Sequence, residues 1–324
     1  MKPQGVVLFF LLMLMADAPD FNSCCFLVPG YAQTVRTLDA SIHLFDYDRS
    51  QTLDIQDRVI EDNDELAIHD ISYESPKGGR VSAYLVIPKG KGPFAGVLFG
   101  HYGLGTRSEF IPEAKLYAKA GAVSLIPDYP WDRAQPWRKS IDNFDKPELD
   151  RETYIQAVID LRRGIDLLLA RNDVDSKRLA YIGHSIGAQW GSILSAVDQR
   201  TKAVVLMAGV AELADLFLRS SDPALIDLRK HLPAGQLEKY TNFMGELDAA
   251  RFVGHSAPTD LLLQFANFDR YIDNTSMQHY IEAASAPKKV LRYDSGHELN
   301  DPQALRDRYA WLARELGIKA DLTP

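Results

Sequence analysis

Ser185, Asp269 and His297 are the three side chains in this sequence whose types and order could activate a hydroxyl group. Ser185 lies within Gly183-His184-Ser185-Ile186-Gly187, a Gly-x-Ser-x-Gly pentapeptide. In a tight strand-to-helix turn, glycines two residues before and after the serine leave room for the neighbouring backbone. The pentapeptide therefore predicts a nucleophile elbow that exposes Ser185 at the carboxyl edge of a sheet.

Asp269 and His297 each follow a predicted strand. The strand 261–265 leads into the loop that carries Asp269, and the strand 289–293 leads into Asp294-Ser295-Gly296-His297. A serine, an acid and a histidine in this chain order, each after its own strand, meet at one edge of a parallel sheet. The three motifs together predict a Ser-His-Asp triad.

Two other aspartates compete with Asp269 for the role of the acid. Asp260 precedes the strand and therefore lies at its wrong end, whereas Asp273 is expected in the cap of the next helix. Asp269 is the preferred acid, and a helix-capping or surface carboxylate is its alternative.

The roles of these groups follow from proton chemistry. A serine hydroxyl is a weak nucleophile, so His297 would take its proton while Asp269 fixes the imidazole tautomer. The oxyanion hole would use the backbone N–H groups of Ile186 and of Tyr102, which lies in the loop 100–105. The alternative is that this loop is only a glycine-rich turn and that another residue supplies the second donor.

Aromatic residues near these motifs are candidates for substrate binding. Tyr129, Trp131 and Trp137 follow a predicted strand and could line an acyl pocket, although packing is an equal alternative. Phe217, Tyr240, Phe243 and Met244 are either the underside of a cap or an ordinary packing face. His184 is interpreted as a packing or hydrogen-bonding residue.

The loop after residue 99 also imitates a dinucleotide fingerprint. Gly103-x-Gly105-x-x-Ser108 lies between a strand and a helix, with Asp128 about 20 residues further on. Serine replaces the third glycine, and the unit follows two edge strands instead of opening the sheet. This alternative leaves Ser185, Asp269 and His297 unexplained and is disfavoured.

The elements that must position these residues form an alternating series. The pattern predicts an antiparallel hairpin followed by parallel strands and helices, eight strands in all. We expect strands at 68–74, 80–87, 95–99, 122–126, 179–182, 203–207, 260–265 and 289–293, and helices near 108–119, 151–171, 188–197, 275–284 and 302–316. The segment 209–256 interrupts the series and is interpreted as a helical cap.

With these motifs in place, the sequence resembles the α/β-hydrolase superfamily over residues 68–316. The run from Asp173 to Ala188 is similar to the branch of dienelactone hydrolase-like and prolyl-oligopeptidase-like esterases. Dienelactone hydrolases proper have a cysteine where Ser185 stands, and this chain has no room for the propeller of the oligopeptidases. The resemblance implies a serine esterase without a metal or an organic cofactor.

The amino terminus predicts export. Lys2 precedes the apolar run 6–15, which has the length of a signal-peptide core and is shorter than a membrane span of about 20 residues. Residues 1–32 are the expected signal peptide, 33–65 a polar arm with one short helix, and 66–324 the hydrolase domain. Cleavage before Gln33 would remove Cys24 and Cys25 and deliver a secreted or periplasmic protein without a membrane anchor.

Composition gives a weaker indication of the partner. The chain has 324 residues and a formal net charge of −8, with Lys and Arg scattered along it, which disfavours nucleic acid. We therefore expect an enzyme that cleaves small carboxylic esters through an acyl-enzyme on Ser185. An exopeptidase or amidase with the same triad and a catalytically silent binding protein are the alternatives.

Overall fold

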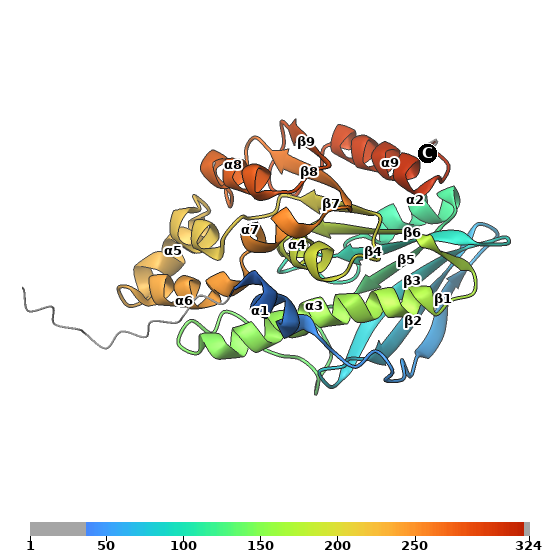
Figure 1. Cartoon of the computed structure of the whole chain (residues 1–324), viewed down its shortest axis with the longest axis horizontal. Helices are drawn as coiled ribbons and strands as arrows, with labels where there is room; N and C mark the ends of the chain where they lie inside the picture. The colour runs from blue at the N-terminus through green and yellow to red at the C-terminus, as the bar shows by residue number, and fades with distance from the viewer. Residues whose placement is uncertain (1–36, 321–324) are drawn as a thin grey trace, which may run out of the picture. The chain divides into compact units, whose positions relative to one another are not determined.

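One sheet runs through residues 37–320, the part of the chain that the computed structural model describes (Figure 1). Its nine strands lie in the order β1-β2-β3-β5-β4-β6-β7-β8-β9. The strands are β1 Gln56–Asp62, β2 Leu66–Glu74, β3 Arg80–Pro88, β4 Phe94–Gly100, β5 Ala122–Pro127, β6 Val174–His184, β7 Ala203–Met207, β8 Asp260–Ala266 and β9 Lys288–Tyr293. The expected signal peptide, its cleavage site and both cysteines lie outside the described residues.

The sheet is antiparallel at one edge and parallel over the rest. β1, β2, β3 and β5 pair antiparallel in turn, whereas all pairs from β5 through β4 to β9 are parallel. This arrangement confirms the predicted α/β class with a mostly parallel sheet. Parallel strands bring the loops at their carboxyl ends to a single edge, and this edge carries Ser185, Asp269 and His297.

The prediction of eight strands is wrong, because β1 forms within the expected polar arm. Six of its seven residues pair with residues of β2, and nearly all of its side chains are exposed. An edge strand of this kind is held by backbone hydrogen bonds and needs no apolar alternation. The sequence pattern therefore gave no signal for it, and Ser185 follows the sixth strand rather than the fifth.

Helices cover both faces of the parallel strands. Every residue of β5 and β7 is buried, although successive side chains point to opposite faces. The main covering helices are α2 Ile111–Ala120, α3 Pro147–Leu169, α4 Ile186–Val197, α8 Asn274–Ala283 and α9 Pro302–Leu316, and a short α1 Leu38–Ile42 precedes the sheet (Figure 1). No helix within residues 37–320 is long and apolar enough to cross a membrane.

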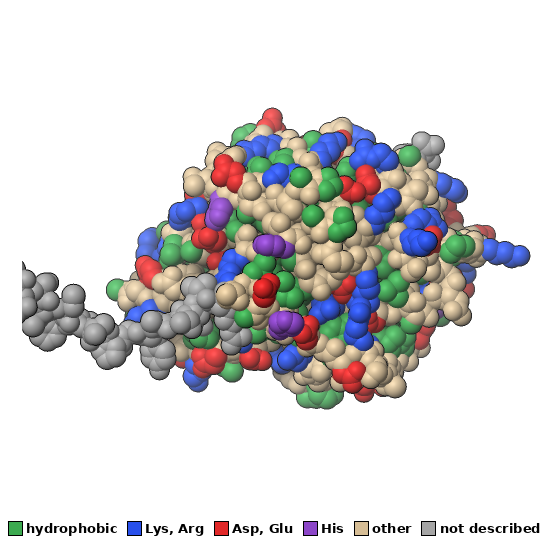
Figure 2. Space-filling view, in the orientation of Figure 1, with side chains coloured by type: hydrophobic (Ala, Val, Ile, Leu, Met, Phe, Trp, Pro, Cys, Tyr) green, Lys and Arg blue, Asp and Glu red, His purple; other side chains and the backbone are tan. Residues whose placement is uncertain are grey.

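An ion pair connects two of these helices, and charges of both signs are mixed on the surface. Arg308 of α9 donates two hydrogen bonds to the carboxylate of Glu113 of α2, at 2.8 and 2.6 Å. On the face that Figure 2 shows, Lys and Arg lie among Asp and Glu and do not gather into one basic patch.

The segment 209–256 between β7 and β8 is helical and contains no strand. It comprises α5 Pro223–His231, α6 Gln236–Met244, α7 Ala249–Phe252 and shorter helical turns. Phe144 and Phe217 pack their rings against Tyr240 with centroid distances of 5.0 and 5.6 Å. The hydroxyl of Tyr240 donates to Asp150 of α3 at 2.8 Å, so the segment is anchored to the start of that helix.

Asp248 of this segment couples the stability of the fold to pH. Its carboxylate accepts the Leu213 N–H at 2.8 Å, and burial, together with the charges of Glu212 and Asp215, raises the pKa of Asp248 to about 8. A carboxyl group whose pKa is higher in the folded state loses its contribution to stability as pH rises from about 4 to about 8.

We expect Asp248→Asn to remove this pH dependence, because the amide keeps an acceptor oxygen and cannot ionise. The difference in free energy of unfolding, variant minus wild type, should increase by roughly 1 kcal/mol for each pH unit between about pH 5 and about pH 8. Urea denaturation at a series of pH values measures the difference. The exposed Glu238→Gln is the control, and parallel pH profiles for wild type and Asp248→Asn would contradict the expectation.

Candidate active site

Ser185 occupies a sharp turn between β6 and α4. Its backbone has φ 57° and ψ −116°, a strained conformation for a residue with a side chain. A Cβ atom on Gly183 would lie 2.2 Å from the carbonyl oxygen of Gly187, and one on Gly187 would lie 2.2 Å from that of Gly100. Only glycine fits at both positions, which explains the pentapeptide.

A continuous chain of hydrogen bonds joins Ser185 to His297 and Asp269. The Oγ of Ser185 lies 2.8 Å from Nε2 of His297, and Nδ1 of His297 lies 2.7 Å from Oδ2 of Asp269. An ionised carboxylate only accepts hydrogen bonds, so the proton of a neutral His297 resides on Nδ1. Nε2 is then free to accept the proton of the serine hydroxyl.

Backbone donors hold Asp269 in place. Its side chain is fully buried, and Oδ1 accepts the N–H groups of Tyr271 and Ile272 at 2.8 and 3.1 Å. Three donors therefore surround the carboxylate. This arrangement fixes its plane toward His297.

The competing aspartates lie elsewhere. Asp260 begins β8, at the opposite end of that strand from the loop with Asp269. Asp273 caps α8 by accepting the Ser276 N–H at 2.8 Å and also faces Arg219. Both positions agree with the expectations from the sequence.

The two expected oxyanion donors differ in their surroundings. Ile186 is the first residue of α4, where helix N–H groups have no intrahelical acceptor. The N–H of Tyr102, by contrast, donates to Oε2 of Glu109 at 2.8 Å. The expectation of a free Tyr102 donor is therefore not met in this structure, because a carboxylate from further along the same loop occupies it.

His101 forms a hydrogen bond with the backbone carbonyl of Tyr102. Its Nε2 accepts the Tyr129 N–H at 3.3 Å, so its proton resides on Nδ1, which donates to the Tyr102 carbonyl at 2.8 Å. Burial lowers the pKa of His101 and keeps the ring neutral. Both polar backbone groups of Tyr102 are thus fixed by side chains.

His184 links three loops of the site. Its Nε2–H donates to the His297 carbonyl at 2.9 Å, and its Nδ1 lies 2.7 Å from Oε1 of Glu109. Both ring nitrogens lie within hydrogen-bond distance of an oxygen atom, so the orientation of the ring is fixed from both sides. The expected hydrogen-bonding role of His184 is met, and Glu109 is the partner that the sequence did not indicate.

A pocket of about 520 Å³ opens beside Ser185. Aliphatic, aromatic and acidic side chains share its wall, and neither Lys nor Arg is among them. The lining residues are Tyr102, Gly103, Leu104, Glu109, Ile141, Asp142, Tyr154, His184, Ser185, Ile186, Gln189, Leu213, Leu216, Phe217, Leu225, Tyr271, His297, Glu298 and Asn300.

Tyr129, Trp131 and Trp137 do not line this pocket. Tyr129 is buried between His101 and Trp131. Trp131 is 8% exposed, and its indole N–H donates to the Gly103 carbonyl at 2.9 Å. Trp137 packs over Gly79 of the β2–β3 turn. The alternative of packing thus accounts for Tyr129 and Trp131, which are buried, whereas Trp137 is 45% exposed and only lies against Gly79.

Several pocket residues had no recognisable signal in the sequence. Glu109 was expected inside a helix, but α2 begins only at Ile111. Asp142 and Glu298 lie in loops, and Gln189 lies on the first turn of α4. Their convergence depends on loop conformations, which hydrophobic periodicity does not report.

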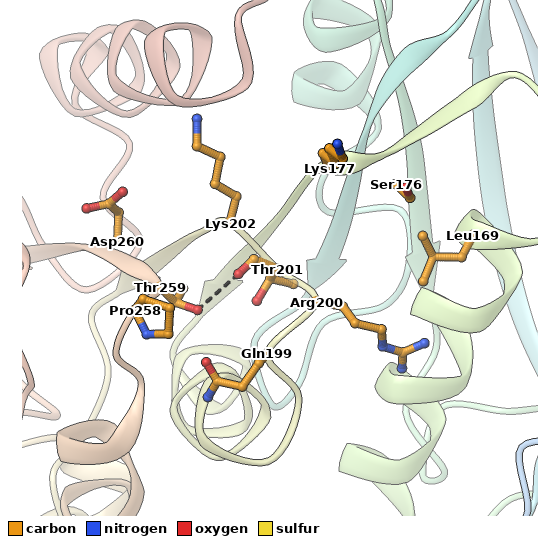
Figure 3. Close-up of a pocket in the computed structure, with 10 residues that line it drawn as sticks. All are labelled: Leu169, Ser176, Lys177, Gln199, Arg200, Thr201, Lys202, Pro258, Thr259 and Asp260. Carbon is orange, nitrogen blue, oxygen red and sulfur yellow. Dashed lines mark hydrogen bonds between the residues drawn. The ribbon is translucent and has the colours of Figure 1, made fainter.

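A second hollow of about 500 Å³ lies at the other end of the strands. It collects residues that precede or begin β6, β7 and β8, including Lys177, Lys202 and Asp260 (Figure 3). The hydroxyl of Thr259 donates to the Thr201 carbonyl across it, at 3.0 Å. The hollow therefore lies at the sheet edge opposite Ser185.

Within residues 37–320, no group of three or more His, Cys, Asp or Glu side chains could hold a metal ion.

Comparisons with known proteins show the fold. No family model and no curated protein matches the sequence. An acetyl xylan esterase from Paenibacillus sp. R4 has 21% identity and a TM-score of 0.70, covering 86% of this chain and 92% of that one. Acetyl xylan esterase 1 from Thermoanaerobacterium has 15% identity, a TM-score of 0.72 and coverages of 86% and 93%. A putative dienelactone hydrolase from Klebsiella pneumoniae has 16% identity and a TM-score of 0.55, and the match covers 78% of this chain and 99% of that one. The chain therefore has the α/β-hydrolase fold.

Proposed function

We propose that this chain, an α/β-hydrolase by its fold, cleaves carboxylic esters through an acyl-enzyme on Ser185. The observation that carries the proposal is the pair of hydrogen bonds from Ser185 through His297 to Asp269, at 2.8 and 2.7 Å, at the wall of a pocket. The esterases among the similar structures support the same reaction class. The proposal includes a small-molecule ester as substrate and no cofactor.

In the first half of the reaction, Nε2 of His297 takes the proton of Ser185 while Oγ attacks the ester carbonyl carbon. The tetrahedral intermediate collapses as the bond from carbon to the alcohol oxygen breaks. His297 returns the proton to that oxygen, so the alcohol leaves neutral and the acyl group stays on Oγ. Asp269 stabilises the imidazolium that forms in between.

The negative oxygen of the intermediate would accept the Ile186 N–H at the start of α4. In the resting enzyme, the Tyr102 N–H donates its hydrogen bond to the Glu109 carboxylate. Tyr102 can contribute to the oxyanion hole only if this hydrogen bond breaks and the N–H donates to the oxyanion instead. In the second half, His297 takes a proton from water while the water oxygen attacks the acyl carbon. The bond from that carbon to Oγ then breaks as His297 returns the proton to Oγ, which releases the acid and regenerates Ser185.

The segment 209–256 is proposed to act as a cap on a hydrolase domain that spans residues 66–324. Leu213, Leu216, Phe217 and Leu225 of this segment line the pocket, so it would contact the substrate. Residues 33–65 would form an arm that contributes β1 to the sheet of this domain as its edge strand. The apolar run 6–15 supports an exported enzyme that is cleaved before Gln33.

Fluorophosphonate labelling tests the proposal in one step. Only a serine activated by a neighbouring base reacts readily with such a probe, so we expect a single adduct on the peptide that contains Ser185. The measurement is mass spectrometry of the digested protein, and urea-denatured protein is the control. A native protein without an adduct at Ser185 would contradict the assignment.

The same preparation should prefer a p-nitrophenyl ester to the p-nitroanilide with the same acyl group. A higher kcat/KM for the anilide would replace the esterase with an amidase that uses the same residues.

A further inference from the structure

Two exposed carboxylates on the pocket wall have no side-chain partner to balance their charge within residues 37–320. Asp142 lies in the loop before α3, and Glu298 directly follows His297. Neither forms a hydrogen bond or an ion pair with any side chain in residues 37–320, whereas the third acid of the wall, Glu109, is held by His184 and the Tyr102 N–H. Among residues 37–320, no Lys or Arg lines this pocket to offset Asp142 and Glu298.

Asp142 lies at an exposed position and has two unusual features. Its backbone has φ 63°, a left-handed conformation that few residues with a side chain adopt. Although its surface is accessible from the pocket, the surrounding protein desolvates the carboxyl group and, with the nearby charge of Asp150, raises the pKa of Asp142 to about 6. Strain of this kind is concentrated at ligand-binding and catalytic sites.

Gln189 supplies an independent sign of a ligand. It is 1% exposed and lines the same pocket one turn after Ser185. Its amide Nε2 has no hydrogen-bond partner, although buried polar groups are nearly always paired. This nitrogen is itself buried, so an oxygen atom of a bound molecule would reach it only after the Gln189 side chain rotates.

The remaining pocket residues could contact the alkyl groups of a positively charged ligand. Leu213, Leu216 and Leu225 provide aliphatic surface, and Tyr154, Phe217 and Tyr271 provide aromatic rings. Aromatic faces attract ammonium cations, and quaternary ammonium groups combine such a charge with an apolar surface. A neutral polyol would use the carboxylates as acceptors but would leave both negative charges unbalanced.

We propose that the pocket selects esters that carry an ammonium group, with Asp142 and Glu298 balancing its charge and the cap residues enclosing its alkyl groups. This inference rests on the proposed esterase function and deepens it by naming the substrate class. An anionic ester would meet two carboxylates and no cation, so it should be the poorest substrate.

The test compares ester pairs that differ in charge and not in shape. Butyrylcholine is paired with 3,3-dimethylbutyl butyrate, and p-nitrophenyl 4-(trimethylammonio)butyrate with p-nitrophenyl 5,5-dimethylhexanoate, so that the ammonium lies on the alcohol side or on the acyl side. For at least one pair, we expect kcat/KM of the cationic ester to exceed that of its neutral isostere by about tenfold. Raising the salt concentration should narrow that ratio.

Variants assign the effect to the two carboxylates. Asp142→Asn and Glu298→Gln should each reduce the charged-to-neutral ratio by about threefold to tenfold. Asp145→Asn is the matched control, because it removes one charge from the same loop at an exposed position outside the pocket. A change at Asp145→Asn as large as that at Asp142→Asn would indicate a general effect of net charge and would overturn the proposal.

The outcomes separate this inference from the proposed function. Ratios of about one or below for both pairs, in an enzyme that cleaves the neutral esters, would overturn the selection of ammonium groups and leave the esterase intact. Cleavage of p-nitrophenyl butyrate without cleavage of any cationic ester would do the same. An absence of turnover with every ester, together with an unlabelled Ser185, would overturn both.

Discussion

Ser185→Ala is expected to lower kcat for a short-chain p-nitrophenyl ester by about a millionfold while the protein remains folded. Alanine removes the hydroxyl oxygen that lies 2.8 Å from Nε2 of His297. Without it, the base has no nucleophile to activate, and the Ile186 N–H alone can stabilise only a slow attack by water. The residual rate, measured by p-nitrophenol release at high enzyme concentration, should exceed the uncatalysed rate by only about 10³–10⁴-fold.

The control for this variant is Ser176→Ala, at an exposed serine in the hollow at the opposite sheet edge (Figure 3). It should keep the wild-type rate. The melting temperature of Ser185→Ala should stay within a few degrees of that of the wild type, because the substitution removes one partly accessible hydroxyl group. Turnover by Ser185→Ala within about tenfold of the wild-type rate would remove Ser185 from the reaction.

The sequence predicted the positions of Ser185, Asp269 and His297 because each of them follows a strand of the parallel part of the sheet. The end of β6 and nearly all of β8 are buried, whereas β9 is mostly exposed or half-buried. A strand such as β7, buried along its whole length, is a continuous apolar run in the sequence. The residues after such runs share one sheet edge by topology, so three side chains far apart in the chain could be placed together without knowledge of any loop.

The sequence could not predict the edge strand β1 or the direction of side chains in loops. β1 lacks apolar alternation because its contacts to β2 are mostly backbone hydrogen bonds. Trp131 could be identified as an aromatic residue after a strand, but whether its indole faced the substrate or the Gly103 carbonyl depended on the path of the loop. Glu109 and Asp142 likewise belong to irregular segments, where no period relates a residue to the direction of its side chain.

The polar network behind the pocket gives these loop residues a common role. Glu109 accepts hydrogen bonds from the Tyr102 loop and from His184, and His184 in turn donates to the carbonyl of His297. The loops that carry the base, the nucleophile and one expected oxyanion donor are therefore joined through two side chains. A movement of Glu109 would affect the Tyr102 N–H and the position of His297 together.

Asp269→Asn is expected to lower kcat by about three to four orders of magnitude, through the tautomer of His297. The amide oxygen of the new side chain would remain with the N–H groups of Tyr271 and Ile272, because these donors require an acceptor. The amide NH₂ would then face Nδ1 of His297 and force that nitrogen to accept. The imidazole proton moves to Nε2, so the atom that should take the serine proton already carries one.

Asp273→Asn is the matched comparison, because it removes the same charge four residues further on and keeps an oxygen for the helix-capping bond to the Ser276 N–H. Its kcat should stay within a few-fold of the wild-type value, the lost ion pair with Arg219 being its main consequence. Steady-state kinetics of the two variants on one ester decide the assignment. If Asp273→Asn were the more damaging, the acid would be Asp273, and the 2.7 Å contact between Asp269 and His297 would be a structural hydrogen bond only.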